Sequence, residues 1–213
     1  MSLPNAFKKG NSIKITGIIG LATVLLLLTA LLIFGNLNND FSFFKDYIST
    51  LGAKGAPFAL GWNICGFALV GIGLVGFGFM YGLLLKDKIV AFCLSLFGVG
   101  YAFTAIPMDM ELVNSAVSKA HILAICIGLA AWLTALSRIG FNTSIKKTIR
   151  HRANTIALLL LASMIGYVAG LWSMPLTHRL VFGLVFGWTT ITSIGLLTAS
   201  RANDTAERNT TGK

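Results

Sequence analysis

The sequence contains few charged residues, and none lies in the middle of its long apolar segments. Charged residues make up 11% of the 213 residues and hydrophobic residues 55%, with a mean hydropathy of +0.80. Because a soluble domain typically contains about 25% charged residues, this composition excludes a protein that faces water on all sides. The lack of charge inside the apolar segments also argues against an ion-coupled transporter, which generally needs ionisable groups within the membrane.

Cysteine and proline are also scarce, with three and four residues. Cys65, Cys93 and Cys126 all fall inside apolar segments, and no CxxC pair is present. This pattern argues against a disulfide framework and against a cysteine-based metal site. Pro107 and Pro175 fall at the expected ends of helices, so they do not predict the broken helices that many transporters use.

Six apolar stretches occupy most of the chain, and a helix that spans a membrane needs roughly 20 apolar residues. The sequence therefore predicts an all-α, polytopic membrane protein, a six-transmembrane-helix bundle in residues 1–200 with short loops and no separate soluble domain. The polar segment 201–213 is expected to be a disordered cytoplasmic tail. The predicted spans are Ile15–Phe34, Phe58–Leu85, Ile89–Ile106, Ser118–Leu136, Ala153–Trp172 and Leu180–Ser200.

The positive charges predict the orientation of these helices. With the N-terminus in the cytoplasm, 13 of the 17 Lys and Arg residues fall in cytoplasmic segments, as the positive-inside rule requires. Both termini are then cytoplasmic. The net charge of +10 is explained by this bias, so we expect contact with membrane lipids and not with nucleic acid. The short loops favour a multi-pass protein of a bacterial inner (plasma) membrane.

Glycines form two recognisable patterns. Gly71, Gly73 and Gly76 spell the GxGxxG fingerprint of dinucleotide-binding proteins, but that motif requires a strand before it and a helix N-terminus after it. Here it falls in the middle of a predicted span, so we interpret it as helix packing. GxxxG pairs let helix backbones approach closely, either within one chain or in a homo-oligomer; they are Gly78/Gly82, Gly166/Gly170 and Gly183/Gly187.

The chemically capable side chains gather on the predicted outer side of the membrane. They come from the long first outer loop, the start of the second helix and the two later outer loops. Because they belong to four separate segments at one depth, they can converge on one pocket. The candidates are Asp46, Ser49, Asn63, Asp109, Glu111, His121, His178 and Arg179.

Three kinds of chemistry fit these residues. In a hydrolase, Ser49 acts as nucleophile or polar ligand, His121 or His178 as base, and Asp109 or Asp46 as the acid that orients the base. In a zinc site, His121, His178 and Asp109 are ligands and one position stays open. A haem held by the two histidines is less favoured, because haem ligands usually lie deeper in a bundle.

These residues also resemble a known pattern in the bacterial and archaeal membrane family called domain of unknown function 998. The matching elements run from Ser49 to Gly52, continue with Pro57 and with Asn63 near Gly66 and Gly71, and end with Pro107, Asp109 and His121. The resemblance implies a six-helix architecture and groups Ser49, Asn63, Asp109 and His121 as the site. The family commonly has an acid where this chain has Thr50. The resemblance implies no particular activity.

The leading functional hypothesis is an outer-side polar pocket that binds or hydrolyses a lipid or amphipathic small molecule. In it, Ser49, Asp109 and His121 are catalytic, and Asp46, Asn63, His178 and Arg179 bind. The alternative is a non-catalytic scaffold, partner subunit or ion-independent transporter, in which the same residues only hold the outer loops onto the bundle.

Overall fold

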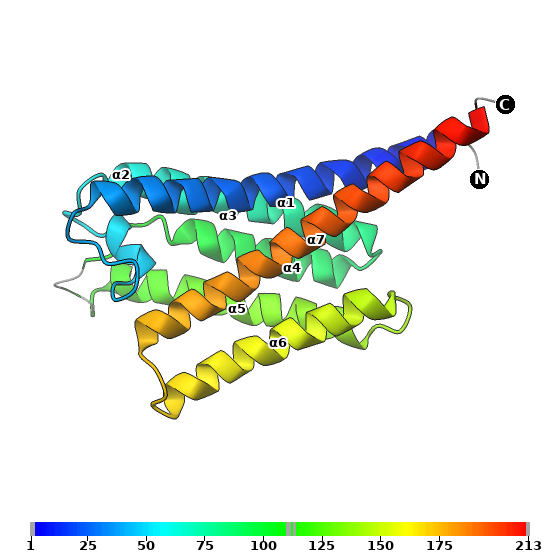
Figure 1. Cartoon of the computed structure of the whole chain (residues 1–213). Coiled ribbons are helices and arrows are strands. Elements are labelled where there is room, and N and C mark those ends of the chain that lie inside the picture. Colours follow the sequence, from blue (N-terminus) through cyan, green and yellow to red (C-terminus); the bar gives the residue numbers. More distant parts are fainter. Residues whose placement is uncertain (1–2, 110–111, 113, 212–213) are drawn as a thin grey trace.

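The structure is a computed structural model that describes residues 3–109, 112 and 114–211. These residues form helices joined by loops, and no strand occurs among them. The order of elements along the chain is shown in Figure 1. They are α1 (Leu3–Leu37), the 3-10 helix η1 (Ile48–Gly52), α2 (Ala59–Trp62), the π-helical turn η2 (Asn63–Ala68), α3 (Leu69–Leu84), α4 (Lys88–Phe103), α5 (Ala116–Phe141), α6 (Lys147–Val168) and α7 (Met174–Thr211).

Four of the helices described are long and apolar enough to cross a membrane: Gly10–Leu37, Ala59–Leu84, Ala116–Phe141 and Met174–Asn203. The first, third and fourth belong to α1, α5 and α7, and the second runs without a break from α2 through η2 to α3. The prediction of an all-helical protein is therefore confirmed for the described residues, and four of their helices suit a membrane protein. Helix α4 has 16 residues, about 24 Å of helix against the roughly 30 Å of a bilayer core, so the number of six crossings stays a prediction.

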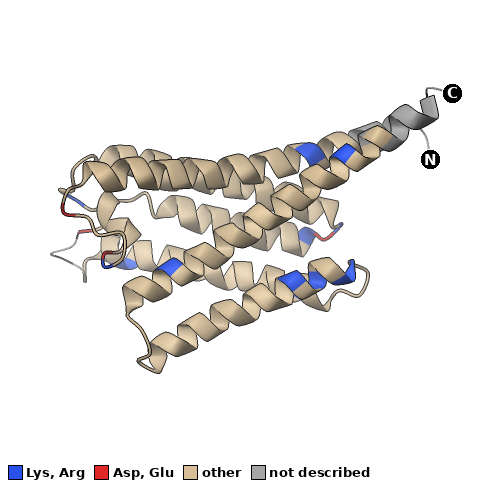
Figure 2. Cartoon of the chain, viewed as in Figure 1, with Lys and Arg blue, Asp and Glu red and all other residues tan. Residues whose placement is uncertain are grey.

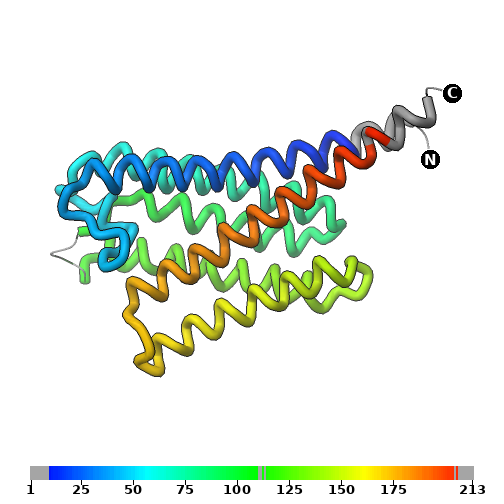
Figure 3. Tube along the Cα trace, in the orientation of Figure 1, coloured from blue at the N-terminus to red at the C-terminus, as the bar shows by residue number. Residues whose placement is uncertain are grey.

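The helices run lengthwise, with α3, α4 and α5 packed in sequence order and α1 packed against α3 and α7 (Figure 1). The Cα trace shows that α1 and α7 converge where both termini lie (Figure 3). We call this the basic end, because it also carries the α3–α4 turn and the α5–α6 loop with most of the Lys and Arg residues (Figure 2). The opposite end, which carries η1, residues 104–109 and the loop 169–173, is called the loop end.

The segment after Ser200 differs from its sequence-based prediction. Where we expected a disordered tail, the backbone of α7 continues as a helix to Thr211. The residues of this segment include Arg201, Ala202, Ala206, Glu207 and Arg208, which are all good helix formers. A helix that is already nucleated inside the bundle extends through such residues at little cost.

Close helix packing explains one of the GxxxG pairs. A Cβ atom added to Gly82 would lie 2.2 Å from the backbone nitrogen of Ala91, and one added to Gly78 would lie 2.7 Å from the backbone of Leu94. These glycines therefore let α3 and α4 touch through their backbones. Gly183 and Gly187 differ, because an added Cβ would meet nothing within 4 Å.

A polar contact at the basic end holds the α3–α4 turn. Asp87 begins α4 as its N-cap and accepts hydrogen bonds from the backbone N–H groups of Ile89 at 3.0 Å and Val90 at 3.2 Å. Its other oxygen accepts a hydrogen bond from Nε of Arg138 on α5 at 2.6 Å. One buried carboxylate thus caps α4 and joins it to α5, a contact that could not be read from the sequence.

Candidate functional site

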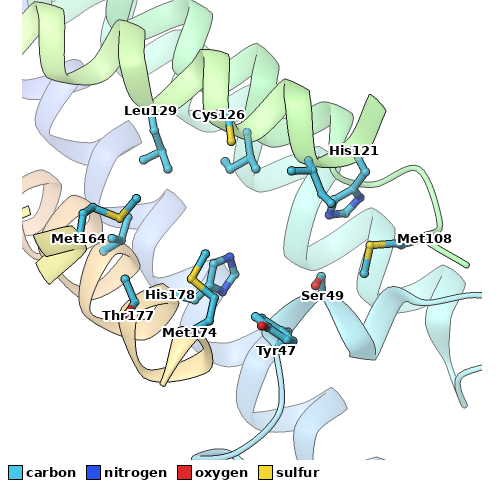
Figure 4. A pocket seen from close by; sticks show the side chains of 13 residues that line it. Tyr47, Ser49, Met108, His121, Cys126, Leu129, Met164, Met174, Thr177 and His178 are labelled. Atoms are coloured by element: carbon cyan, nitrogen blue, oxygen red, sulfur yellow. The ribbon is translucent and has the colours of Figure 1, made fainter. Parts of the chain in front are cut away.

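A cavity of about 370 Å³ lies at the loop end, between η1, α5, α6 and α7. Figure 4 shows its side chains, with those of α5 on one wall and those of α7 on the opposite wall. This volume falls in the range of small-molecule sites, about 300–1,000 Å³. The lining residues are Tyr47, Ser49, Met108, His121, Ile122, Ile125, Cys126, Leu129, Met164, Met174, Thr177, His178 and Val181.

The cavity has a polar end and an apolar end. Tyr47, Ser49 and His121 lie near the loop end, whereas Leu129 lies eight residues further along α5 than His121, about 12 Å deeper. Several lining residues are partly exposed, among them Ile122 at 46% and Met164 at 40%. The cavity therefore opens on the apolar flank of the bundle, where α6 diverges from α5 toward the loop end (Figure 1).

Ser49 is positioned by the fold of η1. The side-chain amide of Asn63 donates to the carbonyl of Gly52 at 3.0 Å, and Leu51 is buried. A Cβ on Gly52 would lie 1.9 Å from Oδ1 of Asn63, so only glycine allows this approach. Asn63 thus anchors η1 to the second spanning helix and does not itself line the cavity. The hydroxyl of Ser49 makes no hydrogen bond to either imidazole within the part of the chain described.

His121 is held in a fixed orientation near the start of α5. Ser115 caps that helix by accepting from the N–H of Ser118 at 3.2 Å. One turn further along, Nδ1 of His121 lies 3.2 Å from the carbonyl oxygen of Ile106. The ring also packs edge-on against Phe67 at a centroid distance of 6.3 Å. His121 is 7% exposed. Its other ring nitrogen, Nε2, has no hydrogen-bond partner in the described chain.

His178 faces the cavity from the opposite wall, on α7. Its ring lies between two aromatic rings, with Phe182 at a centroid distance of 4.5 Å and Tyr47 at 6.0 Å. Its Nδ1 is buried and has no hydrogen-bond partner among the described residues. The structure therefore brings together three of the predicted site residues, namely Ser49, His121 and His178 (Figure 4).

Arg179 and Asp46 do not line this cavity. The guanidinium of Arg179 donates to the backbone carbonyls of Phe43, Ser42 and Asp46 and, at 2.9 Å, to that of Pro175. The carboxylate of Asp46 accepts from the N–H of Ser42 at 2.7 Å. These two residues hold the loop between α1 and η1 closed and tie it to α7.

Asp109 also has a contact role away from the cavity. Its carboxylate pairs with Lys54 at 3.6 Å and accepts from the N–H of Leu112 at 3.1 Å. The position that a triad acid would take, beside Nδ1 of His121, is occupied by the carbonyl of Ile106. Ser49, His121 and Asp109 are therefore not assembled as a triad. Glu111 lies outside the described residues.

The zinc hypothesis needs three ligands at one point. Among the residues described, no group of three His, Cys, Asp or Glu side chains is placed to hold a metal ion. The predicted set of His121, His178 and Asp109 is not formed, because Asp109 turns toward Lys54 and the two histidines lie on opposite walls of the cavity.

Most of the residues that line the cavity could not be identified from the sequence. Met108, Met164, Met174 and also Cys126 resemble ordinary packing residues in or beside apolar segments. Tyr47 lies two residues before Ser49, a proximity that could have identified it. Methionine side chains are flexible and adapt to irregular apolar ligands. The three methionines come from separate segments, so the adaptable wall that they form together is visible only in the tertiary structure.

No family model, curated protein or solved structure matches the chain, so its resemblance to the family called domain of unknown function 998 stays a prediction.

Proposed function

We propose that this protein binds an amphipathic small molecule, such as a lipid, in the cavity between η1, α5, α6 and α7. The observation that carries the proposal is the polarity gradient of a cavity of about 370 Å³. Ile125, Leu129 and Val181 supply an apolar wall for a hydrocarbon chain, and Ser49, His121 and His178 supply polar contacts near the loop end. A cavity that opens on the flank of a spanning bundle can receive such a molecule directly from the membrane.

The orientation belongs to the same proposal. We place the basic end in the cytoplasm, with both termini, and the cavity on the extracytoplasmic side of a bacterial inner membrane. The concentration of Lys and Arg at the basic end supports this placement (Figure 2). In this arrangement α4 and α6 also cross the membrane. Helix α4 is packed between α3 and α5.

The proposal is limited to binding. Hydrolysis by Ser49 would require a base in hydrogen-bond contact with its hydroxyl and a group that orients this base. Neither histidine bonds to Ser49 in the described chain, and the carboxylate of Asp109 pairs with Lys54. Asp46, Asn63, Asp109 and Arg179 all hold loops, as the scaffold alternative expects.

Filling the cavity tests the proposal. In Leu129→Trp the indole would occupy the apolar end, whereas in the control Leu123→Trp it would extend from a residue of α5 that is 59% exposed and does not line the cavity. Each protein is extracted in a mild detergent, and the molecules that remain bound are counted by native mass spectrometry. We expect one amphipathic molecule to remain on the wild type and on Leu123→Trp and to be absent from Leu129→Trp. Equal retention by the two variants would refute the proposal.

A further inference from the structure

The chemical groups at the polar end of the cavity restrict which amphipathic molecule fits. We propose that the ligand is an uncharged lipid that carries a hydroxyl or amide N–H group, and that this group donates a hydrogen bond to Nε2 of His121. The inference rests on the proposed function and names the class of ligand for the same site. Fatty alcohols, acylglycerols and N-acyl amides belong to this class.

None of the residues that line the cavity in the described chain is Lys, Arg, Asp or Glu. Arg179 follows His178 in sequence, but its guanidinium is used by four backbone carbonyls. A charged group costs much free energy in an apolar site unless an opposite charge pairs with it. A carboxylate, phosphate or ammonium head group would find no such partner here.

The contact of His121 with the backbone selects one tautomer of its neutral ring. A carbonyl oxygen can only accept a hydrogen bond, so the contact with Ile106 at 3.2 Å requires a hydrogen on Nδ1. A neutral imidazole carries a single hydrogen, which leaves Nε2 as an acceptor. Figure 4 shows the imidazole of His121 directed into the cavity, toward the side where Ser49 lies. The cavity thus presents a fixed acceptor whose orientation is set by the backbone.

This acceptor is open to a donor supplied by a ligand. Within the described residues, Nε2 of His121 has no hydrogen-bond partner, and the hydroxyls of Ser49 and Tyr47 make no side-chain hydrogen bond either. A lipid hydroxyl can donate to Nε2 and accept from Ser49 or Tyr47 at the same time. An ether or hydrocarbon would leave Nε2 unpaired in an apolar site, which is unfavourable.

Three probes with the same chain test this inference: hexadecanol, its methyl ether and hexadecanoate. The readout is protection of Cys126, an exposed residue of the cavity wall, from N-ethylmaleimide in a Cys65→Ala background. Cys93 is buried and can stay. We expect hexadecanol to protect Cys126 at a concentration about tenfold lower than the methyl ether, because the ether leaves one acceptor unpaired. Hexadecanoate should protect least, because its charge is unpaired.

Variants assign the preference to His121. In His121→Phe the ring remains and the acceptor is lost, so the alcohol and its ether should protect equally, whereas the control His151→Phe should keep the preference. Protection by the ether shows that His121→Phe still folds. The comparison of the three probes on the Cys65→Ala protein decides the question without a variant of His121.

Equal protection of Cys126 in the Cys65→Ala protein by alcohol and ether, or better protection by hexadecanoate, would overturn the ligand assignment. Binding in the cavity would remain supported. The proposed function itself would fail under two joint outcomes: no probe protects Cys126, and Leu129→Trp retains its bound molecule.

Discussion

The buried carboxylate of Asp87 offers the sharpest test of how the bundle is held together. In Asp87→Ala, helix α4 loses its N-cap, which is worth about 1 kcal/mol. The hydrogen bond from Arg138 is also lost. Because the side chain of Arg138 is 47% exposed, water screens this ion pair, and we assign it about 1 kcal/mol. The free energy of unfolding should therefore fall by about 2 kcal/mol in total.

Asp87→Asn separates these two contributions. The amide oxygen of Asn can still accept from the N–H groups of Ile89 and Val90, so the cap remains and only the charge is lost. The variant should lose about 1 kcal/mol, half of the loss in Asp87→Ala. The assay is unfolding in mixed micelles with increasing SDS, followed by far-ultraviolet circular dichroism. Equal losses in the two variants would contradict the assigned role of the cap.

Acid adds a second criterion for Asp87. Burial raises the pKa of its carboxyl group, but hydrogen bonds from the Val90 N–H, from Arg138 and from the Ile89 N–H, together with the charge of Arg138, outweigh burial and set the pKa below its usual value. A lowered pKa stabilises the folded state above the ordinary pKa of about 4, and this stabilisation is lost as pH falls through the folded-state value. The difference in stability between wild type and Asp87→Asn should therefore disappear in acid. A difference that persisted unchanged at pH well below 4 would refute the reasoning.

Three further predictions concern helix packing, the end of α6 and the loop between α1 and η1. Gly82→Ala should lower the free energy of unfolding by about 1–3 kcal/mol, because its Cβ would meet the backbone of Ala91. Gly187→Ala should raise the free energy of unfolding by about 0.5–1 kcal/mol, because its Cβ would meet nothing within 4 Å among the described residues. Equal effects of the two substitutions in the same SDS assay would contradict this packing. Gly170→Ala should cost about 1–2 kcal/mol, because the residue ends α6 with φ +71°; a neutral result would be evidence against this left-handed turn. Arg179→Gln should release the loop between α1 and η1 and increase tryptic cleavage after Lys45, as measured by mass spectrometry. Unchanged cleavage would show that the four carbonyl contacts are not needed.

Much of the fold could be predicted because hydrophobicity acts locally along the chain. Apolar runs of spanning length must be helical in a membrane, where every backbone polar group needs an internal partner. The predicted span Phe58–Leu85 thus agrees closely with the helix Ala59–Leu84. The prediction was poorer at helix ends, because capping side chains and tertiary contacts set them. The span predicted to begin at Leu180 instead begins at Met174.

The candidate site was predictable only in part. Ser49, His121 and His178 could be grouped because topology places them at one end of the bundle, and the structure places them around one cavity. Asp46, Asn63, Asp109 and Arg179 share that end, but they bond to nearby loop atoms. A sequence does not distinguish these two outcomes, because the direction of a side chain depends on how loops fold against helices.

The scarcity of charge within the apolar segments determined, from sequence alone, that the chain is helical and suited to a membrane, because composition fixes the solvent that a surface can face. The tertiary structure decided which polar groups remain free. The backbone carbonyl of Ile106, 15 residues before His121, takes Nδ1 of that histidine and leaves Nε2 in the cavity. This choice depends on the path of the loop between α4 and α5, and no local pattern in the sequence records it.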